Sequence, residues 1–169
     1  MANTYKMMNL ERDTSGGDIV SVQWDGGKLQ NSMPITLGNL VTGETELYYA
    51  YGTGATGTLA SSQVYVVYSP EVMYEAGTMI DDFIVATGSP ARAYGLKVGS
   101  QFRISQIASS VQATATVGDC IVMNATGMNW IVTAQTAAIA GWRFVAKVIE
   151  LNTIGYDGDD AISVKVINA

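Results

Sequence analysis

Short apolar runs separated by glycine are the feature that most constrains the fold of this 169-residue chain. Eighteen glycines, together with scattered aspartates, interrupt nearly every run of β-branched and aromatic residues. Runs of this kind predict short strands, and their close spacing leaves little room for the amphipathic helices of an α/β protein. The expected strands are residues 19–24, 47–51, 64–68, 83–85, 102–104, 120–123, 130–132, 144–149 and 162–167. The sequence therefore predicts a mainly β fold, a compact β-barrel or β-sandwich-like domain.

Two turn signals suggest how neighbouring strands pair. Asp25-Gly26-Gly27 follows the first run directly, and Asp-Gly beside an alternating run is typical of a hairpin. The acidic cluster Asp157-Gly158-Asp159-Asp160 stands between two further runs, where a polar hairpin turn is expected. Both positions are therefore predicted to join antiparallel strands.

Helix signals are few, and one or two short helices are expected. Ser69 is a suitable cap, Pro70 suits the first helical position and Gly77 ends the segment, so residues 69–77 predict a helix of two turns. Residues 107–116 and 133–140 are rich in small and polar side chains, and each fits either a short helix or an irregular loop.

The N-terminal segment differs from the rest of the chain. Residues 1–18 are polar and contain Ser15-Gly16-Gly17, a hinge-like composition, and they predict a flexible, extended N-terminal arm. The arm is either a frayed terminus or a docking segment in which Tyr5, Met7, Met8 and Leu10 bind a partner and become ordered there. Residues 19–169 form the β-rich domain, with a division into two sublobes near residues 80–95 as one possibility.

The charge balance excludes several classes of partner. Charged residues make up 14% of the chain, against roughly 25% in ordinary domains, and the net charge is −6. Nucleic-acid binding depends on Lys and Arg that neutralise phosphates, so no nucleic acid is expected as a partner. No apolar stretch reaches the length of a membrane span and no secretion signal stands at the N-terminus, so we expect no membrane partner and synthesis in the cytoplasm.

Few residues in the sequence are of the types that catalysis requires. The chain has no histidine, and its single cysteine, Cys120, lies in an apolar run where a buried side chain is expected. The letters Gly52 to Gly57 match a dinucleotide loop, but a strand follows too soon for the required helix. Asp81-Asp82 points to opposite faces of a strand, and Asn124-Ala125-Thr126 is expected as a turn. We predict no enzyme activity, no cofactor and no metal site. The cluster Asp157 to Asp160 could suggest calcium, but it lacks the twelve-residue spacing and the terminal glutamate of an EF-hand loop.

Aromatic side chains are the remaining binding candidates. Tyr48, Tyr49 and Tyr51 lie on one run and Tyr65 and Tyr68 on another, and the two runs could pair across a hairpin. Such side chains suit a sugar platform, a protein interface or a core. The low charged fraction favours an interface, because a domain with so few charges exposes apolar patches.

The order of several short motifs resembles a known group of proteins. The motifs are Gly38-Asn39-Leu40, Gly43-Glu44, Tyr48, residues 66–74, residues 91–96, Val98-Gly99, residues 102–105, Val117-Gly118-Asp119, residues 144–150 and Thr153-Ile154-Gly155. From residue 19 to the C-terminus this order resembles the head decoration proteins of tailed phages, also called capsid cement or auxiliary capsid proteins. Two features depart from that pattern: residues 52–58 form a longer Gly-Thr-rich stretch than the group leads us to expect, and the arm before Ile19 has no counterpart.

The resemblance implies a structural virion protein. Such a protein binds the major capsid protein on the exterior of the expanded capsid and stabilises the shell, as homotrimers, after synthesis in the host bacterium. The alternatives from other classes are a phage fibre or carbohydrate-binding module, in which Tyr48, Tyr51, Trp130 or Trp142 would stack on sugars, and a tail structural protein.

Overall fold

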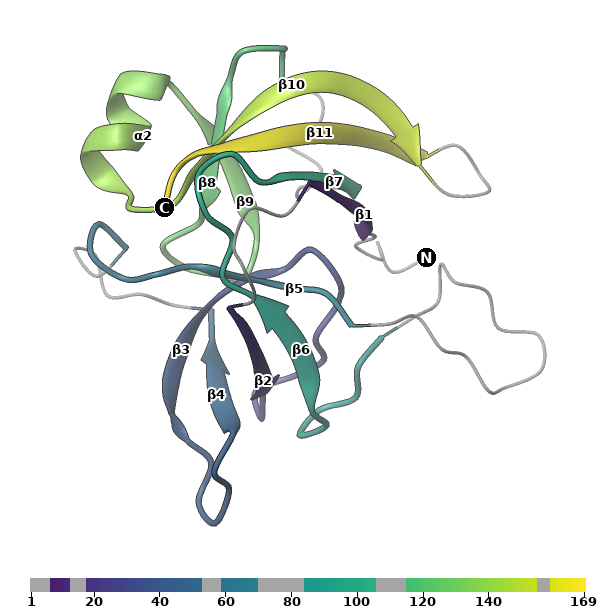
Figure 1. Cartoon of the computed structure of the whole chain (residues 1–169), viewed down its shortest axis with the longest axis vertical. Coiled ribbons are helices and arrows are strands. Elements are labelled where there is room, and N and C mark those ends of the chain that lie inside the picture. Colours follow the sequence, from purple (N-terminus) through teal and green to yellow (C-terminus); the bar gives the residue numbers. More distant parts are fainter. Residues whose placement is uncertain (1–6, 13–17, 53–58, 70–83, 106–114, 155–158) are drawn as a thin grey trace.

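The fold is mainly β, as the sequence predicted, and consists of a small closed barrel beneath a second sheet (Figure 1). The computed structural model describes residues 7–12, 18–52, 59–69, 84–105, 115–154 and 159–169. Among these residues one helix, α2 (Gln135–Gly141), lies beside the second sheet next to β8 (Figure 1).

The barrel closes around five strands in the order β2-β4-β3-β5-β6. β2 pairs in parallel with β4 and antiparallel with β6, which closes the ring. The remaining pairs of the barrel, β3 with β4, β3 with β5 and β5 with β6, are antiparallel. The strands are β2 (Ile19–Gln23), β3 (Pro34–Leu40), β4 (Leu47–Tyr51), β5 (Tyr65–Val67) and β6 (Ala91–Tyr94).

The second sheet has six strands in the order β1-β7-β11-β10-β8-β9, all antiparallel to their neighbours. Its centre is the long β10–β11 hairpin, with one shorter strand paired to each side. The strands are β1 (Met7–Arg12), β7 (Gln101–Ser105), β8 (Cys120–Met123), β9 (Trp130–Thr133), β10 (Val145–Ile154) and β11 (Asp159–Asn168). The hairpin predicted around the acidic cluster is confirmed, since Ile154 pairs with Asp159.

The hairpin predicted after the first run is wrong. A turn does form at Asp25, but β2 pairs with β4 and β6 and not with β3. The physical reason is that both edges of β2 are occupied, by β4 and by β6, so β3 has no edge of β2 to pair with. At the turn itself the Trp24 indole ring lies against Gly26 and Gly27, and a Cβ on Gly26 would be 2.7 Å from Nε1. The absence of a side chain at these glycines leaves room for the aromatic ring. The chain then continues to Leu29, which forms an isolated antiparallel β-bridge with Val85.

The predicted pairing of the two tyrosine-rich runs is also wrong. Both runs form strands, β4 and β5, but β3 lies between them in the barrel. The segment that links β4 to β5 is therefore not a hairpin loop. β3 itself was missed because Pro34, Gly38 and Asn39 weaken its β pattern.

The helix predictions had different outcomes. Within 133–140 the structure decides in favour of a helix, α2 (Gln135–Gly141), whose last turn closes through Trp142 N–H donating to the Ala138 carbonyl. Of the predicted helix 69–77 only Ser69 belongs to the described residues, and 107–116 lies outside them up to residue 114.

Packing between the barrel and the six-stranded sheet forms the main core. Phe102, Ile104, Val148 and Val164 from the sheet meet Val66 from the barrel, all at 2% exposure or less. Trp130 lies among them, with ring centroids 6.2 Å from Phe102 and 5.7 Å from Phe144. Its indole N–H donates a 2.8 Å hydrogen bond to the Ser32 carbonyl in the barrel. The two sheets therefore share one core, and a second cluster fills the barrel itself.

The far face of the six-stranded sheet is covered at one end by α2. Ala138 of the helix packs on Cys120, Val122 and Val145. Cys120 is fully buried, which confirms its predicted role as a small core side chain.

The N-terminal segment is partly included in the domain. Residues 7–12 form β1, an edge strand on β7 with register shifts after Met8 and Leu10, so the arm does not lie wholly outside the β-rich domain. The chain passes from the barrel to the six-stranded sheet between β6 and β7, at residues 95–100. The barrel and the six-stranded sheet share a core. The division into two sublobes near residues 80–95 stays a prediction.

Ser32 holds a strained position that predicts a stabilising substitution. It is fully buried, has φ of 74°, and its hydroxyl has no hydrogen-bond partner among the described residues. Left-handed backbone costs a non-glycine residue roughly 1–2 kcal/mol, and a buried unpaired hydroxyl costs about 1–3 kcal/mol. Ser32→Gly removes both penalties against an entropic loss of roughly 0.5–1 kcal/mol. We expect roughly 1–4 kcal/mol of added stability in urea unfolding.

The control for this substitution is Ser32→Ala, which removes the hydroxyl but keeps the Cβ. We expect Ser32→Ala to be less stable than Ser32→Gly. An alanine variant as stable as the glycine variant would show that the backbone at residue 32 is not strained.

Candidate functional site

The partner-binding residues predicted in the arm fall mainly in β1. Met7, Met8 and Leu10 stand opposite Ile104, Arg103 and Phe102 of β7. Tyr5 lies outside the described residues. The structure thus brings three of the four to one sheet edge, and their binding of a partner stays a prediction.

The catalytic candidates from the sequence find no constellation in the described part of the chain. No group of three or more Cys, Asp or Glu side chains there is arranged to hold a metal ion. Burial raises the pKa of the Cys120 thiol, which makes the reactive thiolate harder to form. Asn124 accepts a hydrogen bond from the Thr126 N–H at 3.1 Å, so the predicted turn is confirmed. Asp81, Asp82 and residues 53–58 and 155–158 lie outside the described residues.

The aromatic candidates separate into buried and exposed side chains. Trp130 is fully buried, so it cannot stack on a sugar. Trp142 is partly buried and donates its indole N–H to the Met123 carbonyl at 2.9 Å. Tyr51 is 48% exposed and its ring packs over Gly38, where a Cβ would collide with it. Tyr48 is partly buried and lines a pocket.

Large apolar side chains are exposed at several places on this β scaffold. Val117 is 62% exposed, and β10 beside it exposes Ile149 and Leu151. The full set among the described residues is Ile19, Leu40, Tyr51, Val98, Val117, Ile139, Ile149 and Leu151. On a chain with only 14% charged residues, these side chains are the surface most suited to a protein partner.

Two of these side chains stand on turns of the same design. Val98 and Val117 each precede a glycine with positive φ, 97° at Gly99 and 103° at Gly118. Each glycine N–H donates a 2.9 Å hydrogen bond to a strand of the central hairpin, Gly99 to the Val166 carbonyl and Gly118 to the Val148 carbonyl. The turns are therefore fixed to the sheet, and both valines are exposed to solvent. Because the backbone of each turn is already ordered, a partner that binds the valines orders little further structure.

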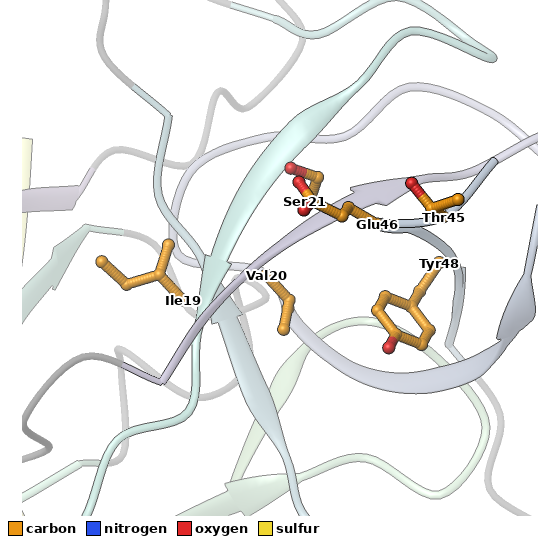
Figure 2. A pocket seen from close by; sticks show the side chains of 6 residues that line it. All are labelled: Ile19, Val20, Ser21, Thr45, Glu46 and Tyr48. Atoms are coloured by element: carbon orange, nitrogen blue, oxygen red, sulfur yellow. The ribbon is translucent and has the colours of Figure 1, made fainter.

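A pocket opens where β2 and β4 diverge. The parallel pairing begins with Ser21 opposite Leu47, so Ile19 and Val20 extend beyond the start of β4. The pocket has a volume of about 370 Å³ and is lined by Ile19, Val20, Ser21, Thr45, Glu46 and Tyr48. Figure 2 shows the Val20 side chain and the Tyr48 ring in one half of the view, and the oxygen-bearing side chains of Ser21, Thr45 and Glu46 in the other.

A polar cluster closes the same end of the barrel. Asp18 accepts hydrogen bonds from the Gln63 amide at 2.9 Å and from the Tyr65 hydroxyl at 3.3 Å. Burial raises the pKa of Tyr65, and the nearby Asp18 carboxylate and Tyr48 raise it further. The phenol is thus held protonated as a hydrogen-bond donor.

The raised pKa of Tyr65 predicts a loss of stability at alkaline pH. Below pH 10, the ordinary tyrosine value, this phenol is protonated in both states and its contribution is fully present. Above pH 10 the unfolded chain releases the proton while the folded chain retains it, so the free energy of unfolding falls. Tyr65→Phe should make that fall shallower than in the unsubstituted protein when urea unfolding is compared between pH 8 and pH 11.

This comparison must use the difference between the two proteins, because the pKa of Cys120 is raised as well and acts over a similar range. Identical pH profiles for Tyr65→Phe and the unsubstituted protein would contradict the prediction. At neutral pH the variant should lose only about 0.5–1.5 kcal/mol for the missing hydrogen bond.

Several residues of this surface were not predicted from the sequence. Glu46 and Thr45 were not singled out, because the pocket depends on a parallel strand pair that no local pattern reveals. The repeated Val-Gly letters at 98–99 and 117–118 were visible and were the available signal for the two matching turns.

In the part of the chain that the structure describes, no helix has the length and apolar character needed to cross a membrane. Comparison of the chain with family models, with curated proteins and with solved structures finds no match.

Proposed function

We propose that this chain is a structural virion protein that binds the exterior of the expanded capsid of a tailed bacteriophage and stabilises it, as a homotrimer. Its partners are the major capsid protein of the same phage and further copies of itself. The observation that supports this most is the set of eight large apolar side chains exposed among the described residues, on a chain with few charges. The order of sequence motifs that resembles head decoration proteins supports the same proposal.

Capsid stabilisation follows from differential binding. A protein that binds the expanded lattice better than the unexpanded one shifts the equilibrium toward expansion by that difference in affinity. A trimer with three contacts to the shell multiplies the effect of each modest contact through its effective concentration. Residues such as Val98 and Val117, fixed on hydrogen-bonded turns, suit this function because little order is lost on binding.

Co-sedimentation with capsids of the parent virus tests the proposal. The intact protein is expected to sediment with expanded shells. Deletion of residues 1–16, which removes the edge strand β1, is expected to weaken attachment while the barrel and the other five strands of the sheet stay folded. Circular dichroism of the deleted protein provides the folding control. Unchanged occupancy of the deleted protein on the shell would contradict the role of the arm.

A carbohydrate-binding fibre module is the second candidate, and exposed Tyr51 over Gly38 is the observation that favours it. Its test is tyrosine and tryptophan fluorescence against a panel of glycans, with Tyr51→Ala as the matched variant. Quenching that Tyr51→Ala abolishes would support this candidate, and no response across the panel would contradict it.

A further inference from the structure

The pocket between β2 and β4 combines two aliphatic side chains and a tyrosine ring with two hydroxyl side chains and one carboxylate. Val20 and Tyr48 pack against the core of the barrel and form its base, and Ile19 extends the apolar side. Among the described residues that line the pocket, Glu46 is the only charged one. A cavity of about 370 Å³ is at the small end of the range for ligand sites, roughly 300–1,000 Å³, so the occupant is one side chain or a small group.

Glu46 is held at the pocket by a closed loop. The turn between β3 and β4 is fixed by two hydrogen bonds, from the Val41 N–H to the Leu47 carbonyl at 2.8 Å and from the Glu44 N–H to the Val41 carbonyl at 2.9 Å. Among the described residues, no Lys or Arg forms an ion pair with Glu46. Within the described residues, no ion pair of Glu46 competes with a cation that a partner would supply.

The chemistry of the lining selects among ligands. A phosphate or carboxylate would meet the negative charge of Glu46 with no cation in the described lining to offset it. A lysine or arginine side chain matches both parts of the pocket, because its aliphatic stem packs on apolar surface while its charged head binds a carboxylate. The ring of Tyr48 adds a favourable surface for a cation.

We propose that this pocket receives a lysine or arginine side chain of the protein partner. The stem lies against Val20 and Tyr48, and the cationic head binds the Glu46 carboxylate with Ser21 and Thr45 as further hydrogen-bond acceptors. That the partner is the capsid rests on the proposed function. The pocket itself is tested without a capsid.

The first test follows backbone amide shifts by NMR as Nα-acetyl-lysine methylamide is added to the full chain. The expected result is a saturable shift of the amides of residues 19–21 and 45–48, with a much smaller response to Nα-acetyl-norleucine methylamide, which has a comparable stem without the amine. Glu46→Gln should weaken the lysine response about two- to five-fold, the range of an exposed ion pair. Glu44→Gln, in the same loop but outside the pocket, should leave it unchanged.

Three results would overturn the proposal. Equal responses to the lysine and norleucine compounds would show that the charge is not recognised. Equal losses in Glu44→Gln and Glu46→Gln would assign the effect to the general charge of the loop. A response of the same amides to methyl glycosides, with none to lysine, would assign the pocket to carbohydrate.

The second test uses Glu46→Lys and Glu44→Lys in capsid co-sedimentation. Glu46→Lys should lower the affinity for the shell about tenfold or more, since a like charge now meets the incoming side chain, whereas Glu44→Lys should bind normally. Normal binding by Glu46→Lys would overturn the pocket as a capsid contact. If the unsubstituted protein binds no capsid but the lysine shifts appear, the pocket stands and the capsid assignment fails.

Discussion

Trp130→Ala is expected to lower the free energy of unfolding by about 3–5 kcal/mol, the range for large-to-small changes at buried aromatic positions. The side chain is fully buried between Phe102 and Phe144, and its indole N–H reaches the Ser32 carbonyl across the junction of the two sheets. Truncation leaves a cavity and an unpaired carbonyl in the shared core. Urea unfolding monitored by circular dichroism measures the loss.

The hydrogen bond and the packing can be separated with phenylalanine variants. Trp130→Phe keeps an aromatic ring and loses the bond to Ser32, so we expect a loss between that of the alanine variant and none. Trp142→Phe is the matched control, because Trp142 also donates its indole N–H to a carbonyl but is only partly buried. A loss in Trp142→Phe equal to that in Trp130→Ala would contradict the central position of Trp130.

Asn31→Ala is expected to destabilise the protein by roughly 2–4 kcal/mol, because two buried backbone groups lose their partner at once. The Asn31 amide donates to the Ser69 carbonyl at 3.0 Å, and the Asn31 side-chain carbonyl accepts from the Ser69 N–H at 2.8 Å. Both residues are buried, so water does not replace these bonds at low cost. Thermal unfolding should show a Tm lower by several degrees.

Two further variants are compared with Asn31→Ala. Asn31→Asp keeps an acceptor for the Ser69 N–H but cannot donate when ionised, and it should also be strongly destabilising. Thr36→Ala removes a weaker bond, 3.4 Å from its hydroxyl to the Tyr51 carbonyl, and should cost less than about 1 kcal/mol. Equal losses of unfolding free energy for Asn31→Ala and Thr36→Ala would contradict the importance of the two hydrogen bonds between the Asn31 side chain and the Ser69 backbone.

Local patterns were sufficient for most of the strands. The apolar run at Cys120 and the run at Trp130 form β8 and β9, and they pair with each other as neighbours in sequence often do. The acidic turn after β10 also specified its partner, because a tight connection leaves few alternatives. In both cases the paired strands are close in sequence, so the local pattern of apolar runs and turn residues predicts which strands pair.

Partners distant in sequence were not predictable in the same way. β2 pairs with β4 in parallel and with β6 on the other side, and neither choice has a signature in the run from Ile19 to Gln23. After β2 the Trp24 ring packs on Gly26 and Gly27, and in the sequence alone the Asp-Gly-Gly letters resemble a hairpin turn. The pocket depends on the same parallel pairing, so Tyr48 could be named as an aromatic candidate while its neighbour Glu46 could not.

Binding of the chain to an expanded capsid is the central claim. The most direct measurement is the number of copies that sediment with each expanded and unexpanded shell of the parent virus as the protein concentration rises. We predict saturable binding to the expanded form, with a copy number that is a multiple of three, and weaker binding to the unexpanded form. Absence of binding to both forms would contradict the claim.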